Sequence, residues 1–102
     1  MGEQLSPILR RLSDNVIGFW CPGCDEAHVI RYGAANTGLG WTWNGSVDRP
    51  TLTPSVLAFG HQRCHSFVTD GKIQFLSDCT HSLVNQTVAL PPWPQGMETH
   101  YE

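Results

Sequence analysis

Charged residues are scarce in this chain of 102 residues, and basic ones are fewer than acidic ones. They make up 15% of the sequence and leave a formal net charge of −3, so no overall positive potential attracts a nucleic-acid backbone. The sequence has no apolar stretch of transmembrane length, and its first residues lack the charged and apolar regions of a secretory signal. We therefore expect a cytoplasmic protein that does not bind membranes and for which nucleic acid is not the expected partner.

Two catalytic signatures are also missing. The sequence contains neither the G-x-S-x-G motif of α/β-hydrolases nor the H-E-x-x-H motif of zinc proteases. Their absence favours a binding protein over an enzyme of either class.

The composition indicates a small globular domain rich in β-structure. Hydrophobic residues make up 40% of the chain, and its length is near the lower limit at which one chain buries a self-sufficient core. Ten glycines and seven prolines divide it into short segments, as is typical of strands joined by turns. We predict a mainly β fold, a small antiparallel β-sandwich or barrel-like domain over residues 16–94.

One short helix is expected before this domain. Apolar residues at positions 5, 8, 9 and 12 lie on one helical face, and Ser6-Pro7 suits a helix start. The sequence thus predicts an N-terminal helical segment over residues 1–15. The last residues, 95–102, are expected to form a tail.

The turn Cys21-Pro22-Gly23-Cys24 predicts a zinc knuckle, because it can direct two thiolates at one tetrahedral ion. Only one C-x-x-C pair is present, so the other ligands must come from elsewhere in the chain. A metal could contribute about 10–16 kcal/mol to the folding of such a small domain. The expected zinc ligands are Cys21, Cys24, Cys64 and Cys79, with His28 or His65 as alternatives for one position.

Two other interpretations of the cysteines stay open. Buried thiols can pack as small hydrophobic groups without binding a metal. The turn also resembles a redox motif, although Asp25-Glu26 would raise the pKa of its thiols and no βαβ pattern surrounds it.

A β-hairpin is predicted over residues 63–81, with Asp70-Gly71 at its turn. In a two-residue turn, Val68 faces Ile73 and Ser66 faces Phe75. Side chains alternate across a strand, so this register places Cys64 and Cys79 on one face of the hairpin. A three-residue turn would instead move Cys79 to the other face.

The opposite face of this hairpin carries His65 and Asp78, beside which a serine could form a hydrolytic pair with the imidazole. Alternatively, a zinc ion with an open position could activate a water molecule. A third interpretation makes these histidines surface residues or hydrogen-bond partners of metal ligands. The candidate catalytic residues are Ser55, His65, Ser66, Asp78 and His81.

The order and spacing of four motifs between Gly18 and Trp93 resemble a family of small phage and prophage proteins. Members of this family often carry the name "ammonia monooxygenase", although the chain has no transmembrane span or oxygenase-type ligand set. The motifs are Phe19-Trp20-Cys21-Pro22-Gly23-Cys24, Trp41-Thr42-Trp43-Asn44-Gly45, the segment from Arg49 to Ser55, and Cys64-His65-Ser66-Phe67-Val68 with the residues up to His81.

More distant relatives accompany bacterial ubiquitin-like conjugation genes, where the resemblance implies a peptidase role. They share a Pro-Ser segment comparable to Pro54-Ser55 and a Ser-His-Phe element, where this chain has His65-Ser66-Phe67. The resemblance as a whole implies a phage-encoded, zinc-binding accessory protein. The acidic, compact, tryptophan-rich chain without a complete catalytic motif further predicts that it binds a host or phage protein, as a protein that counters a defence system would. The alternative is a small peptidase-like hydrolase. The oligomeric state stays open, a homodimer included.

Overall fold

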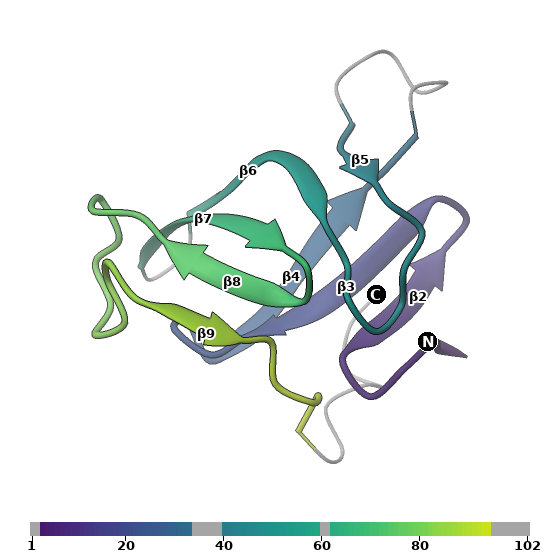
Figure 1. Ribbon diagram of the computed structural model, residues 1–102, viewed down its shortest axis with the longest axis horizontal. Helices are drawn as coiled ribbons and strands as arrows, with labels where there is room; N and C mark the ends of the chain where they lie inside the picture. Colours follow the sequence, from purple (N-terminus) through teal and green to yellow (C-terminus); the bar gives the residue numbers. More distant parts are fainter. Residues whose placement is uncertain (1–2, 34–39, 60–61, 95–102) are drawn as a thin grey trace.

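Two antiparallel sheets form the computed structural model, which describes residues 3–33, 40–59 and 62–94 (Figure 1). The first sheet has the order β1-β2-β3-β4, with strands Glu3–Gln4, Leu9–Ser13, Val16–Cys21 and Glu26–Arg31. The second has the order β5-β6-β7-β8-β9, with strands Thr42–Trp43, Leu52–Phe59, Arg63–Thr69, Lys72–Phe75 and Thr87–Ala89. The predicted mainly β fold is confirmed. The described residues include no helix that is long and apolar enough to cross a membrane.

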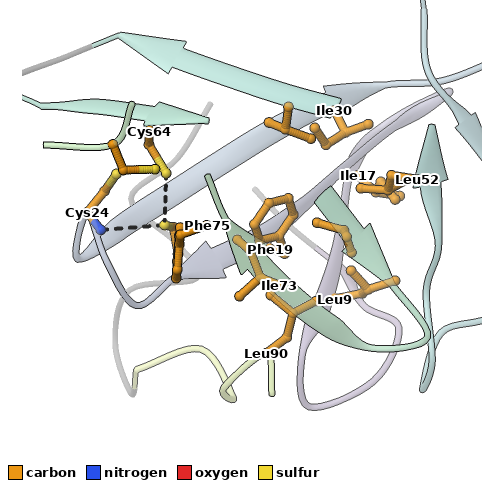
Figure 2. Close-up of a cluster of buried hydrophobic side chains, with 14 residues drawn as sticks. Leu9, Ile17, Phe19, Cys24, Ile30, Leu52, Cys64, Ile73, Phe75 and Leu90 are labelled. Atoms are coloured by element: carbon orange, nitrogen blue, oxygen red, sulfur yellow. Dashed lines mark hydrogen bonds between the residues drawn. The ribbon is translucent and has the colours of Figure 1, made fainter. Parts of the chain in front are cut away.

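The sheets pack face to face around one core (Figure 1). The first sheet contributes Phe19 and Ile30, and the second contributes Val68 and Ile73, all of them without exposed surface. Figure 2 shows Cys24 and Cys64 at one end of this core, next to Phe75. The sulfur atoms are therefore part of the sandwich interior.

The predicted N-terminal helix is wrong, because this segment belongs to the first sheet. Ser6 reverses the chain here: its Oγ accepts hydrogen bonds from the amides of Ile8 at 3.2 Å and Leu9 at 3.1 Å. Strand β2 then pairs with β1 and with β3, where Leu9 lies opposite Phe19. Long-range pairing thus overrides the helical spacing of the apolar residues. Strand β2 lies before the predicted boundary at residue 15, and the predicted tail, 95–102, lies outside the described residues.

The predicted hairpin is confirmed as β7–β8. Asp70 and Gly71 have φ values of 53° and 79°, as a primed two-residue turn requires. Opposite residues include Ser66 with Phe75, and Val68 with Ile73. The two-residue turn therefore fixes which side chains of β7 enter the core and which face outward.

The packing of β2 generates a stability prediction. We expect Leu9→Ala to lower the free energy of unfolding by about 2–5 kcal/mol, because Leu9 has no exposed surface and a cavity would remain. Leu57→Ala is the matched control: Leu57 is 46% exposed, and its loss should change stability by no more than about 0.5 kcal/mol. Denaturant unfolding followed by circular dichroism measures both. Equal stabilities would show that Leu9 does not pack between the sheets.

Candidate functional site

A bulge in β6 creates the first part of the site. Leu52 pairs with Val68, and Val56 pairs with Ser66, so the paired positions are four residues apart on β6 but two apart on β7. Such extra residues re-aim side chains locally. Here the bulge includes Ser55, whose carbonyl accepts a hydrogen bond from the Trp41 indole at 3.2 Å.

His65 lies between a hydroxyl and a carboxylate. Its Nε2 is 2.9 Å from Ser55 Oγ, and its Nδ1 is 3.1 Å and 3.2 Å from the two carboxylate oxygens of Asp78. Leu57 lies directly opposite His65 on β6, so Ser55, two residues earlier, is a diagonal neighbour within reach of the imidazole ring. The strand register thus explains how the hydroxyl and the imidazole meet.

The turn after β8 brings Asp78 to the other side of His65. The Leu76 amide donates to the His65 carbonyl at 2.9 Å, and the Cys79 amide donates to the Leu76 carbonyl at 3.2 Å. Cys79 Sγ also lies 3.2 Å from both the amide nitrogen and the carbonyl oxygen of His65. These contacts anchor the residues on either side of Asp78 to the backbone of β7.

A serine, a histidine and an aspartate in this order can perform acyl transfer. The imidazole takes the hydroxyl proton as the serine attacks a carbonyl carbon, and the carboxylate holds the imidazole in the required tautomer. The side chains of His65 and Asp78 are 27% and 42% exposed, so a substrate can approach them from solvent.

A cavity of about 540 Å³ opens beside the His65–Asp78 pair. Its walls carry several groups that can form hydrogen bonds, and it is lined by His65, Gln74, Phe75, Leu76, Ser77, Asp78 and Asn85. The cavity therefore borders His65 and Asp78, and Ser55 is not among the residues that line it.

Four buried side chains form a group able to hold a metal ion at the end of the core: Cys21, Cys24, His28 and Cys64. Each offers one ligand atom, and these atoms lie within 4.8 Å of one another. The sulfurs of Cys21 and Cys64 are 3.6 Å apart. Two sulfurs of a tetrahedral zinc site lie at a similar distance, about 3.8 Å. The distance between these two sulfurs is thus close to that of a tetrahedral zinc site.

The thiols of this group interact strongly. A hydrogen bond from Cys64 lowers the pKa of Cys21 to about 4, and the same contact raises the pKa of Cys64. Burial and the charge of Cys21 raise the pKa of Cys24 to about 12. Ionisation of Cys21 thus opposes ionisation of the other two thiols. A bound cation would remove this opposition, because it stabilises all three thiolates together.

The buried Nε2 of His28 has no hydrogen-bond partner among the described residues. A buried polar atom without a partner is costly, and a metal ion would satisfy it. The register of β3 and β4 accounts for its position, because Phe19 pairs with His28 and Cys21 pairs with Glu26. Cys21 and His28 are therefore diagonal neighbours on one face. A β-hairpin that turns at the C-x-x-C motif could have predicted this position of His28 from the sequence.

The structure places Cys79 in a second group instead, with Cys64 and His81. The His81 ring covers the knuckle so closely that a Cβ on Gly23 would clash with its Cε1 atom. Its Nδ1 accepts a hydrogen bond from the Leu83 amide at 3.2 Å, and its buried Nε2 has no partner among the described residues. Cys64 thus belongs to both groups, and His81 lies on the sulfur side, away from the Ser55–His65–Asp78 row.

Ser66, the other predicted nucleophile, does not meet His65. It has no exposed surface, and its Oγ lacks a hydrogen-bond partner among the described residues. Ser66 follows His65 directly along β7, so the two side chains lie on opposite faces. The structure therefore brings Ser55, His65 and Asp78 together and leaves Ser66 in the core.

Comparison with known proteins gives one family. The match covers residues 3–76, which include strands β1 to β8 with Ser55 and His65, and ends two residues before Asp78. Neither a curated protein nor a solved structure matches the chain. Because the match covers well over half of the sequence, the chain belongs to the family described as bacterial ubiquitination-like system serine protease (BubE).

Proposed function

We propose that this protein is a serine peptidase in which Ser55 is the nucleophile, His65 the general base and Asp78 the carboxylate that orients the imidazole. The observation that carries the proposal is the row of contacts from Ser55 Oγ to His65 Nε2 at 2.9 Å and from His65 Nδ1 to Asp78 at 3.1 Å. The serine protease family supports the same reaction class.

The reaction follows from these contacts. Ser55 Oγ attacks the carbonyl carbon of a substrate amide while His65 Nε2 accepts the hydroxyl proton. The imidazolium then donates this proton to the leaving nitrogen, and an acyl-enzyme ester remains on Ser55. A water molecule that loses its proton to His65 hydrolyses the ester, and Asp78 stabilises the positive charge on the ring in both halves of the reaction.

The metal is proposed to be zinc with a structural role. Three thiolates and one imidazole form a common closed zinc site, and Cys21, Cys24, His28 and Cys64 supply such a set. Four protein ligands would leave no open position for a reactive water molecule. The support for this role is that the donors lie in the core, whereas His65 and Asp78 face solvent.

The accessory function is a separate proposal that the family does not support. Phage origin, cytoplasmic location and a partner protein from host or phage stay predictions, and the oligomeric state stays open. A phage protein that counters a defence system would need a surface that binds its partner. That surface need not include Ser55, so this proposal does not depend on the peptidase.

Covalent labelling tests the nucleophile. We expect a fluorophosphonate probe to add one label to the purified protein, and peptide mass spectrometry to locate it on Ser55, because His65 activates this hydroxyl. Ser55→Ala should abolish labelling, and His65→Ala should slow it by at least about a hundredfold.

Ser66→Ala is the matched control. Its hydroxyl is buried without a partner, so its removal should leave both the fold and the labelling rate unchanged. Labelling that persists in Ser55→Ala, or that disappears in Ser66→Ala while the fold is intact, would contradict the assignment of the nucleophile.

Metal analysis tests the zinc site. We expect one zinc ion per chain by plasma mass spectrometry, and chelation should unfold the domain because the ion contributes about 10–16 kcal/mol. Cys21→Ser and His28→Ala should weaken binding, which cobalt titration can follow through the visible bands of a tetrahedral complex. Cys79→Ser should keep the ion, because Cys79 lies outside the four-residue group. Full metal content in His28→Ala together with its loss in Cys79→Ser would instead support a site of four cysteines.

A further inference from the structure

Exposed apolar side chains gather on the outer face of β6 and β7, around the proposed nucleophile and base. Among the described residues, the large apolar side chains with high exposure are Leu57 at 46%, Phe59 at 70% and Phe67 at 42%. All three belong to these two strands and alternate with buried or partly buried neighbours. Such an apolar cluster on a soluble surface indicates a binding site.

The strand register places this cluster beside the proposed reaction centre. Leu57 lies directly opposite His65, and Phe59 lies directly opposite Arg63. Phe67 follows His65 by two residues on β7, so both face the same way. Alternate residues of a strand are about 6.6–6.8 Å apart. Along β6, Leu57 lies two residues and Phe59 four residues beyond Ser55, so a bond held at Ser55 Oγ has these apolar side chains within about four residues of it.

A positive charge lies at the Phe59 end of this face. The Arg63 guanidinium lies 5.5 Å from the centre of the Phe59 ring. Arg63 is exposed, and within the described ranges no carboxylate forms a salt bridge with it. A ligand that covers Phe59 would therefore bring its own negative charge close to an unneutralised cation.

We propose that this outer face binds the substrate as an extended peptide, with apolar side chains within about four residues of the scissile bond and an acidic residue at the Arg63 end. The inference rests on the proposed peptidase function, because Ser55 Oγ fixes where the scissile bond lies. An extended peptide has the same two-residue repeat as the strands beneath it, so its alternate side chains can follow the row of exposed groups. A second copy of the chain seated on this face would cover Ser55 and exclude the substrate.

A mixture of synthetic peptides that covers all pairs of neighbouring residues tests the proposal, with cleavage sites identified by mass spectrometry. We expect sites enriched in Leu, Ile, Val or Phe near the cleaved bond and in Asp or Glu on one side. The variants are Leu57→Ser, Phe59→Ser, Phe67→Ser and Arg63→Gln, and Thr87→Ala on the edge strand β9 is the control. Fluorophosphonate labelling of the same preparations measures the reactivity of Ser55 without a peptide.

The expected result is a fall of about tenfold in kcat/KM for the preferred peptide, relative to the labelling rate, for each apolar side chain removed. Arg63→Gln should remove the acidic preference, and Thr87→Ala should change neither measurement. Cleavage without apolar or without acidic enrichment, or unchanged relative kcat/KM in the variants, would overturn the proposal while labelling at Ser55 upholds the peptidase.

Failure of the unmodified protein to react with the probe would overturn both proposals together. Sedimentation of the same preparations tests the other occupant. If the protein is a dimer and the variants Leu57→Ser, Phe59→Ser and Phe67→Ser are monomers, this face binds a second copy of the chain, and the docking of a peptide is overturned.

Discussion

The alternation of side chains along β7 is the constraint on which both parts of the site depend. Cys64, Ser66 and Val68 point into the core. His65, which lies between Cys64 and Ser66 in the sequence, points to the outer face. A shift of one residue in the pairing of β7 would exchange the two sets. The two-residue turn at Asp70-Gly71 fixes this register, so one short hairpin aligns both the sulfur group and the contacts of His65 with Ser55 and Asp78.

The same strand couples the two parts of the site. Cys64 precedes His65 directly, and Cys79 follows Asp78 directly. Cys79 Sγ contacts both the amide and the carbonyl of His65, so the residue after the carboxylate holds the strand that carries the imidazole. A metal that fixes Cys64 would therefore also restrain the backbone at His65. The proposed metal site and the Ser55–His65–Asp78 contacts are therefore joined through the backbone of β7.

The sulfur group also compensates for limited core size. A chain of this length buries a smaller share of its surface than a larger domain does, and the described core is one cluster between two sheets. Figure 2 shows Cys24 and Cys64 extending that cluster at one end. Three buried thiols cannot all ionise without a counter-charge, so the group favours a cation that joins the β3–β4 turn to β7.

The local sequence by itself determined the β7–β8 hairpin, the knuckle at Cys21 and Cys24, and the shared outward face of His65 and Asp78. Asp70-Gly71 specifies the turn of the β7–β8 hairpin through positive φ angles that few other residue pairs adopt. The alternation of side chains along β7 then fixes which of them face outward. The tertiary structure decided that residues 9–13 form a strand, because the pairing of Leu9 with Phe19 is invisible to local periodicity. It also decided between the two serines, because the pairing of β6 with β7 brings Ser55 to His65 while Ser66 stays in the core. The division of His28 and Cys79 between two groups likewise depends on how the sheets meet, a long-range distance that sequence spacing does not contain.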